Sequence, residues 1–116
     1  MGADAIAHVV SLISGCDWFA VRKEAKKHGK QRLIEGADIA GSDILLVDDI
    51  VTTGGSILKA LEAVKDSGAT VTFATCLIDR GEAARERLHE AGVPYEPLLT
   101  YRDLGIEPVG SGRVRA

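Results

Sequence analysis

The sequence predicts an α/β fold of three layers, α/β/α, in which a mainly parallel sheet of about four strands lies between helices. The first observation is an unbroken apolar run, Ile44-Leu45-Leu46-Val47, which is typical of a strand buried on both faces, as in a parallel sheet. The second is the helical apolar period that begins at Ile57, after a glycine-rich turn. The third is another apolar strand, Val71 to Ile78, which the chain reaches only after that helix.

The length and composition favour one soluble globular domain, residues 1–116. Apolar residues make up 46% and charged residues 27%, and the net charge of -3 argues against general nucleic-acid binding. No apolar run is long enough to span a membrane, and the start of the chain lacks the pattern of a signal peptide. Cys16 and Cys76 are too far apart for a C-x-x-C pair, so we expect reduced core cysteines of a cytoplasmic protein.

The chain opens on a helix rather than on a strand. Asp4 is a suitable cap for a helix from Ala5 to about Ser14, and Gly15 stops it. Its predicted apolar face consists of Ile6, Val9, Val10 and Ile13. We interpret His8 as a surface or packing residue. A short strand, Trp18 to Val21, follows, and the opening helix suggests that an N-terminal strand is absent or supplied otherwise.

A basic segment comes next, RKEAKKHGKQRLIEG, over residues 22–36. Its basic residues surround His28 and are Arg22, Lys23, Lys26, Lys27, Lys30 and Arg32. Either a solvated helical face or a mobile arm would explain this excess, and Gly29 and the lack of an apolar face favour an exposed loop. Facing a phosphate site, such a loop would close over the ligand and neutralise developing charge.

Two acids, Asp48 and Asp49, stand at the end of the central strand, and a turn rich in hydroxyls and glycines follows them. Backbone N–H groups of such a turn and the positive end of the next helix attract an anion. Gly54 and Gly55 allow close approach and positive φ, and Thr52, Thr53 and Ser56 supply hydroxyl donors. The acids repel phosphate, so they suit the hydroxyls or the metal that a sugar phosphate brings with it. A ribose 5-phosphate carries both the hydroxyls that suit the acids and the phosphate that suits the turn.

The later elements alternate in the same way. A helix from about Ser56 to Ser67 ends at Gly68, and the strand 71–78 ends in Asp79-Arg80-Gly81, at the edge where parallel sheets bind ligands. A helix from about Glu82 to Ala91 has Ala84 and Leu88 inward and a solvated charged face. Residues 93–99 form an extended edge segment confined by two prolines. Thr100 and Asp103 resemble a capping box for one last helical turn.

The sequence from Asp48 to Ser56, DDIVTTGGS, resembles the phosphoribosyl-pyrophosphate (PRPP) signature of type I phosphoribosyltransferases. It lacks the lysine of a Walker loop and the G-x-G-x-x-G dinucleotide pattern. A phosphorelay receiver also carries an acidic pair, but at its first strand, whereas this pair lies mid-chain. The resemblance implies a PRPP site formed by Asp48, Asp49, Ile50, Val51, Thr52, Thr53, Gly54, Gly55 and Ser56.

The segment FAVRKEAKKHG resembles the catalytic loop of orotate phosphoribosyltransferases, and RLIEG matches the return strand of that loop. The resemblance implies that Arg22, Lys23, Lys26 and His28 reach the pyrophosphate of PRPP, often across a homodimer interface, with Lys26 as the main catalytic helper. It also implies that Arg80 holds the orotate carboxylate, assisted by Thr52. From the residues alone, a salt bridge of Arg80 to Asp79 or to a helix acid is equally favoured.

The implied reaction transfers phosphoribose from PRPP to orotate and gives orotidine 5'-monophosphate and pyrophosphate, in pyrimidine nucleotide (UMP) synthesis. Asp48 and Asp49 would position the ribose hydroxyls, and Mg²⁺ would arrive with PRPP rather than on direct side-chain ligands. The resemblance covers the C-terminal part of that family, without its N-terminal hood and first strand. A shortened chain, a minimal protein completed by a partner, and a PRPP-binding module without catalysis all stay open, as does a transferase for another base.

Overall fold

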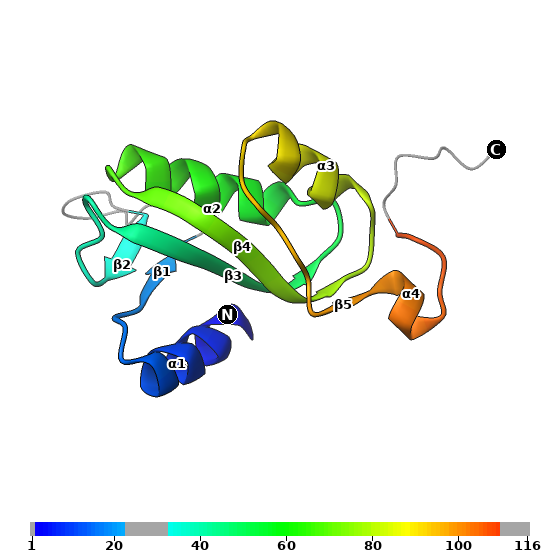
Figure 1. Cartoon of the computed structure of the whole chain (residues 1–116), viewed down its shortest axis with the longest axis horizontal. Helices are drawn as coiled ribbons and strands as arrows, with labels where there is room; N and C mark the ends of the chain where they lie inside the picture. Colours follow the sequence, from blue (N-terminus) through cyan, green and yellow to red (C-terminus); the bar gives the residue numbers. More distant parts are fainter. Residues whose placement is uncertain (1, 23–32, 110–116) are drawn as a thin grey trace.

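The computed structural model describes residues 2–22 and 33–109. In chain order (Figure 1) the elements are α1 Gly2–Ser14, β1 Phe19–Val21, β2 Ile34–Gly36, β3 Asp43–Val51, α2 Gly55–Asp66, β4 Thr70–Asp79, α3 Ala83–Glu90, β5 Leu99–Thr100 and α4 Tyr101–Leu104. Within these described ranges no helix has the length and apolar character needed to cross a membrane. The order of the elements along the chain confirms the predicted order.

The strands form two separate sheets. β3, β4 and β5 are parallel and lie in that order, with Val47 opposite Thr75 and Asp48 opposite Cys76. β1 and β2 form an antiparallel pair of their own. The described residues place three strands in the parallel sheet, against the prediction of about four. β1 pairs with β2 instead, because the two strands flank the same segment and an antiparallel return is the shortest connection between them.

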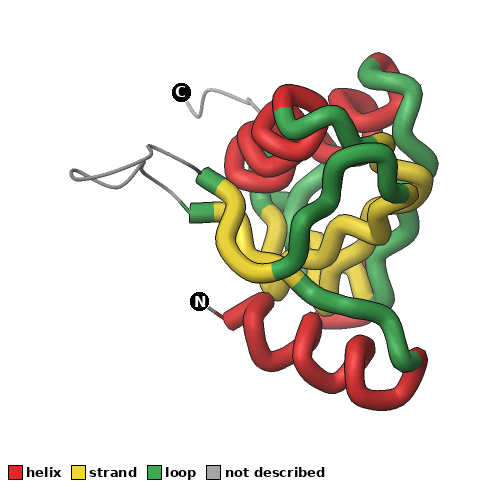
Figure 2. The backbone as a smooth tube through the Cα atoms, turned by 90° about the vertical axis from the view of Figure 1, so that its left-hand side faces the viewer, coloured by secondary structure: helices red, strands yellow, loops and turns green. Residues whose placement is uncertain are grey.

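Helices cover both faces of the parallel sheet, which confirms the three-layer prediction. α2 and α3 lie on one face and α1 on the other (Figures 1 and 2). The core lies between the sheet and the first two of these helices. Its most deeply buried large side chains are Ile57, Leu61, Val64, Cys76 and Leu88. The three from α2 have the spacing of one helix face, so burial of that face follows from the sequence pattern.

The second face of β3 is covered less than predicted. Ile44 and Leu46 are buried, but Leu45 is 44% exposed. The expectation of burial on both faces is therefore wrong, because α1 covers only part of this side of the sheet. β3 also continues through both acids to Val51, rather than ending before them.

α1 differs from prediction at its start and in its apolar face. The helix begins before Asp4, so this residue lies in the first turn and not at the cap. Its carboxylate interacts favourably there with the positive end of the helix dipole. Val9 is 54% and Ile13 81% exposed. Smaller side chains, among them Ala3 and Ala7, line the cavity on the sheet side of α1. The predicted apolar face is thus wrong for Val9 and Ile13, whereas Val10 lines the same cavity as the two alanines.

The connection after α1 confirms one prediction and corrects another. His8 packs edge-on against Trp18, with ring centroids 4.0 Å apart, so the packing role is confirmed. Cys76 is buried as predicted, whereas Cys16 is exposed. Cys16 lies in the connection between α1 and β1 rather than inside an element, and this is why it escapes the core.

The C-terminal elements agree with the sequence pattern. The backbone N–H of Leu98 donates to the Cys76 carbonyl at 2.9 Å, so the 93–99 segment runs along the edge of β4 as predicted. The Thr100 and Asp103 capping box is present at the start of α4. The inward position of Leu88 in α3 is also confirmed. These elements hold the end of β4, where the candidate site begins.

Candidate functional site

Two adjacent carboxyl groups, of Asp48 and Asp49, lie near the C-terminal end of β3. Asp48 Oδ1 accepts from the Asp49 N–H at 2.8 Å, and Asp49 Oδ1 accepts from the Ile50 N–H at 2.8 Å. Burial raises the pKa of Asp48, and the carboxyl and charge of Asp49 add to this, although the Asp49 N–H opposes it. The Ile50 N–H and the Asp48 carboxyl lower the pKa of Asp49. The pair thus combines one carboxyl that protonates more readily with one that stays charged.

The loop of residues 52–55 joins β3 to α2 through a left-handed residue. Gly54 has φ +87° and stands at the helix N-cap, where no side chain caps the helix. A Cβ on Gly54 would lie 2.9 Å from the Cβ of Ala84, so both the conformation and the space require glycine. Gly55 has no positive φ, and a Cβ there would meet only Thr53 Oγ1, at 3.6 Å. The prediction of positive φ is confirmed for Gly54 and wrong for Gly55.

The first turn of α2 offers backbone donors next to the acid pair. The first N–H groups of a helix have no partner within the helix, and the helix dipole places positive charge there. Gly54 has no side chain that could accept from this turn, and Thr53 Oγ1 accepts from the Gly55 N–H only at a long 3.4 Å. The N–H groups of this turn are therefore available to an anion. Phosphate is the anion that such a loop and helix start accommodate best.

The 52–55 loop rests on the connection between β4 and α3. The Arg80 N–H donates to the Val51 carbonyl at 2.8 Å. A Cβ on Gly81 would lie 2.3 Å from the Thr52 carbonyl oxygen, so the two backbones are in close contact. The ends of β3 and β4 are therefore tied together at the edge where the sequence predicts the ligand.

Arg80 does not form the predicted alternative salt bridge with its neighbour. Asp79 is 3% exposed, and its carboxylate accepts instead from the Gly81 N–H at 3.0 Å and from the Tyr95 hydroxyl at 2.7 Å. The Arg80 side chain is half-buried and forms no ion pair within residues 2–22 and 33–109. Its guanidinium remains available for a carboxylate ligand.

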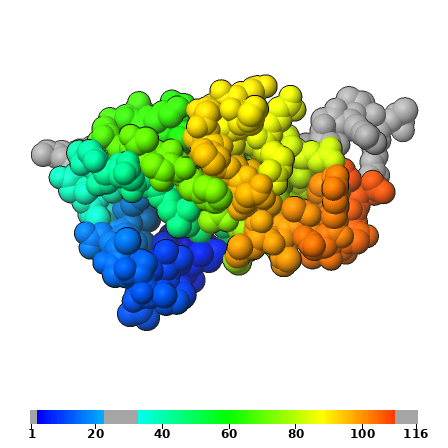
Figure 3. Space-filling model, in the orientation of Figure 1, coloured from blue at the N-terminus to red at the C-terminus, as the bar shows by residue number. Residues whose placement is uncertain are grey.

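A cavity of about 900 Å³ opens between α1, β1 and the edge of β3. Arg22, Asp48, Asp49 and Ser56 all line it, whereas residues 52–55 and Arg80 do not. In the space-filling view α1 projects from the body of the molecule beside this region (Figure 3). The acid pair therefore lines the cavity together with Ser56 of α2, whereas the preceding loop does not.

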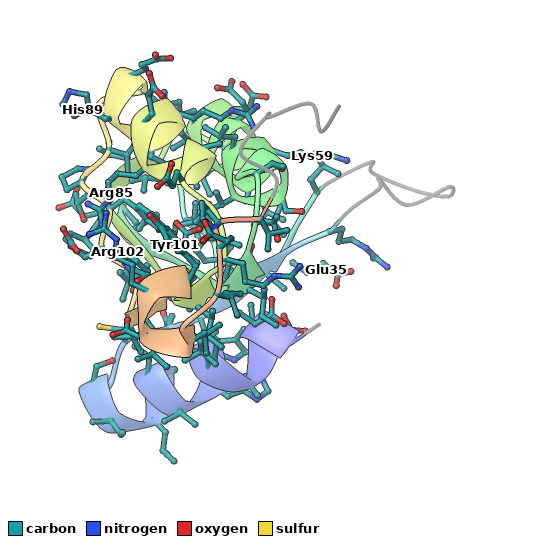
Figure 4. The ribbon with its side chains drawn as sticks, turned by 90° about the vertical axis from the view of Figure 1, so that its right-hand side faces the viewer. Glu35, Lys59, Arg85, His89, Tyr101 and Arg102 are labelled. Atoms are coloured by element: carbon teal, nitrogen blue, oxygen red, sulfur yellow. The ribbon has the colours of Figure 1, made fainter. Side chains whose placement is uncertain are left out.

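Arg22 already has an acidic partner. Its Nη1 donates to Glu35 Oε1, so the ion pair links the end of β1 to β2. Glu35 of β2 and Lys59 of α2 lie on the same side of the molecule (Figure 4). The other predicted pyrophosphate contacts, Lys23, Lys26 and His28, lie outside the described residues. In the described part of the chain, no group of three or more His, Cys, Asp or Glu side chains could hold a metal ion.

Arg87 is a further residue of the site that the sequence pattern did not indicate. Its Nη1 donates to the Thr53 carbonyl at 2.8 Å, so a residue assigned to a solvated face contacts the loop. One signal was available: Arg87 follows Ala84 by three residues and therefore lies on the same side of the helix as that buried alanine.

Comparison with known proteins gives one family and close relatives. Residues 4–93 match the model of the phosphoribosyl transferase domain. The orotate phosphoribosyltransferase of Mycobacterium avium is 43% identical over 108 residues, which are 91% of this chain and 60% of that protein. The corresponding protein of Corynebacterium glutamicum is 44% identical over 91% of this chain and 59% of its own length. The chain thus spans about three fifths of these relatives.

Solved structures of similar proteins have the same fold. The Mycobacterium tuberculosis orotate phosphoribosyltransferase in complex with PRPP has a TM-score of 0.67 and 40% identity, over 77% of this chain and 50% of that one. The orotate phosphoribosyltransferase of Aeropyrum pernix has a TM-score of 0.74 and 37% identity, over 84% of this chain and 55% of that one.

Proposed function

The chain belongs to the phosphoribosyltransferase domain family, and we propose that it binds PRPP and transfers phosphoribose to orotate, giving orotidine 5'-monophosphate and pyrophosphate. The observation that carries the proposal is the acid pair Asp48 and Asp49 directly beside the glycine-capped start of α2. The acid pair suits vicinal ribose hydroxyls, and the start of α2 suits the 5-phosphate. A similar protein, from M. tuberculosis, has been solved with PRPP bound.

The reaction separates charge, and the residues around the acid pair suit both products. Departure of pyrophosphate leaves positive charge on the ribose, which the carboxylates of Asp48 and Asp49 stabilise. The basic segment, with Arg22, Lys23, Lys26 and His28, provides positive charge for the pyrophosphate, and Lys26 is the main helper. Little proton transfer is required.

Arg80 is the proposed anchor of orotate. Its guanidinium is half-buried at the edge where β4 ends, and it can bind a carboxylate through two parallel hydrogen bonds. Thr52, across the same edge, would assist. The backbone contacts between the β4 end and the 52–55 loop would keep the orotate and PRPP sites in register.

The acid pair also suits Mg²⁺. Magnesium prefers carboxylate and phosphate oxygens and usually keeps several waters, so two carboxylates beside a diphosphate fit it without an all-protein cage. PRPP would carry the ion in, with Asp48 and Asp49 nearby. Bound Mg²⁺ would offset negative charge on the pyrophosphate.

We further propose that the protein is a cytoplasmic homodimer in pyrimidine nucleotide synthesis. The basic segment would then reach the site of the neighbouring subunit. The apolar side chains of Leu45, Phe73 and Leu77 are exposed and are compatible with a protein contact beside the part of the sheet that α1 covers.

The test is the loss of orotate absorbance when the chain is mixed with PRPP, Mg²⁺ and orotate. We expect a rate proportional to protein concentration and its loss in Lys26→Ala. No turnover by the wild-type chain would overturn the proposal of catalysis.

A PRPP-binding module without catalysis is the second candidate, and the ion pair of Arg22 with Glu35 favours it because it engages one proposed pyrophosphate contact. Such a module would bind PRPP with Mg²⁺ and lose binding when Asp48→Asn is combined with Asp49→Asn. It would be indifferent to Lys26→Ala in the orotate assay.

A further inference from the structure

α3 contacts the 52–55 loop at two consecutive residues. The Arg87 guanidinium donates to the Thr53 carbonyl at 2.8 Å, and Ala84 leaves no room for a Cβ on Gly54. Thr53 and Gly54 share one peptide group, so α3 holds this peptide group from the carbonyl side and from the glycine Cα. Arg87 supplies the only hydrogen bond to it from α3 among the described residues.

The orientation of this peptide group decides where its N–H points. In a planar trans peptide the C=O and the N–H point in opposite directions. Because the Thr53 carbonyl points toward Arg87, the Gly54 N–H points away from α3. Within the described residues this N–H donates no backbone hydrogen bond. This leaves the Gly54 N–H for an anion bound at the start of α2 to accept from.

We propose that Arg87 is a positioning residue that orients the Thr53–Gly54 peptide group for the 5-phosphate of PRPP, an inference that rests on the proposed function. Arg87 acts through the backbone and does not touch the substrate. Its charge adds to the positive potential of the loop, and its hydrogen bond removes the freedom of the peptide group to rotate. Both effects favour a bound phosphate over an empty loop.

The neighbouring Arg85 provides a matched control. It lies on the same helix and carries the same charge, but its guanidinium donates to Glu96 at 3.2 and 3.3 Å and lies 5.8 Å from the Tyr95 ring centroid. Figure 4 shows Arg85 on the side of the molecule away from Lys59. Removing either arginine costs one positive charge, but only the Arg87 change frees the Thr53 carbonyl.

The experiment measures the dissociation constants of ribose 5-phosphate and of PRPP with Mg²⁺, by calorimetry, for the whole chain. The variants are Arg87→Met, Arg87→Lys and Arg85→Met. Arg87→Met should weaken both ligands about tenfold, because a peptide group that is free to rotate holds its N–H less well toward the phosphate and one nearby positive charge is lost. Arg87→Lys should restore binding to within about threefold of wild type, because one donor is sufficient here. Arg85→Met should stay within about twofold.

A merely structural role would give a different pattern. Arg87 is exposed, so its replacement should leave the melting temperature close to that of Arg85→Met while the dissociation constants diverge. Arg87→Gln replaces the Met variant if that variant does not fold. Equal affinities for the Arg85 and Arg87 variants would overturn the inference and leave the proposed function standing. Arg87-dependent binding without orotate turnover would overturn the catalysis alone, and no binding by the wild type would overturn both.

Discussion

The Tyr95 hydroxyl donates a 2.7 Å hydrogen bond to Oδ2 of Asp79, and both side chains are buried. The other carboxylate oxygen of Asp79 accepts from the Gly81 N–H at 3.0 Å. Tyr95 therefore fixes the carboxylate that shapes the turn around Arg80. Burial, with the hydrogen bonds of the hydroxyl to Cys76 and Asp79, raises the pKa of Tyr95 above its ordinary value, so the hydroxyl keeps the proton that it donates.

Tyr95→Phe should lower the free energy of unfolding by about 1–2 kcal/mol, because it leaves a buried carboxylate oxygen without its donor. Urea denaturation at pH 7 measures the loss. Tyr101→Phe is the control, since the Tyr101 hydroxyl donates to Glu82 at the exposed surface and its removal should cost less than about 0.5 kcal/mol. Equal losses in the two variants would contradict the role of the buried pair.

The two cysteines should differ in reactivity. Burial raises the pKa of the Cys76 thiol to about 11, whereas Cys16 is exposed. The thiolate is the reactive form, so at pH 8 a thiol reagent should label Cys16 alone in the folded protein and both cysteines after denaturation. Mass spectrometry of labelled peptides checks this. Rapid labelling of folded Cys16→Ser would contradict it.

Asp48→Asn should stabilise the free protein at pH 7 and weaken PRPP binding. The folded state raises the pKa of Asp48 from 3.8, so its charged form is disfavoured and wild-type stability decreases as pH rises through the folded pKa. Asparagine removes this charge and can still accept from the Asp49 N–H. We expect a higher melting temperature at pH 7 and about tenfold or greater loss of PRPP affinity.

The stabilisation by Asp48→Asn should disappear below the ordinary pKa of 3.8, where Asp48 is protonated in both the folded and the unfolded wild type. Asp49→Asn gives the opposite sign, because the pKa of Asp49 is lowered and its charged form stabilises the fold above 3.8. Thermal melts of both variants from pH 3 to pH 7 test this. If the melting temperatures of the two variants changed with pH in the same way relative to wild type, this prediction would be wrong.

Adjacent glycines should respond differently to alanine. Gly54→Ala places a side chain at φ +87° and 2.9 Å from Ala84 Cβ, so we expect a loss of about 2–3 kcal/mol and much weaker phosphate binding. Gly55→Ala meets no close contact and lies in the first turn of α2, where alanine favours the helix by up to about 1 kcal/mol. Urea denaturation compares them. A stable Gly54→Ala would contradict the requirement.

Local sequence patterns predict the structural features that depend only on residues close to one another in the chain. The apolar spacing of α2, the Thr100 capping box and the strand-to-helix turn at Gly54 all need only a few consecutive residues. What the sequence does not predict is which face another element covers. Leu45 stays exposed because α1 is too short a cover, and Cys16 lies in a connection. Arg87 contacts the loop only because α3 folds back beside it, a contact between residues 34 positions apart.

Within the described residues, β3 pairs with another strand along one of its two edges, and the unpaired edge affects how readily the protein aggregates. An unpaired strand edge is a template on which a second chain can add a strand and begin an aggregate. β3 carries carboxylates at Asp43, Asp48 and Asp49, so two such edges repel one another while these groups are charged. The acids proposed for substrate recognition thus also oppose edge-to-edge pairing of β3 strands from different chains, and acidification weakens this repulsion.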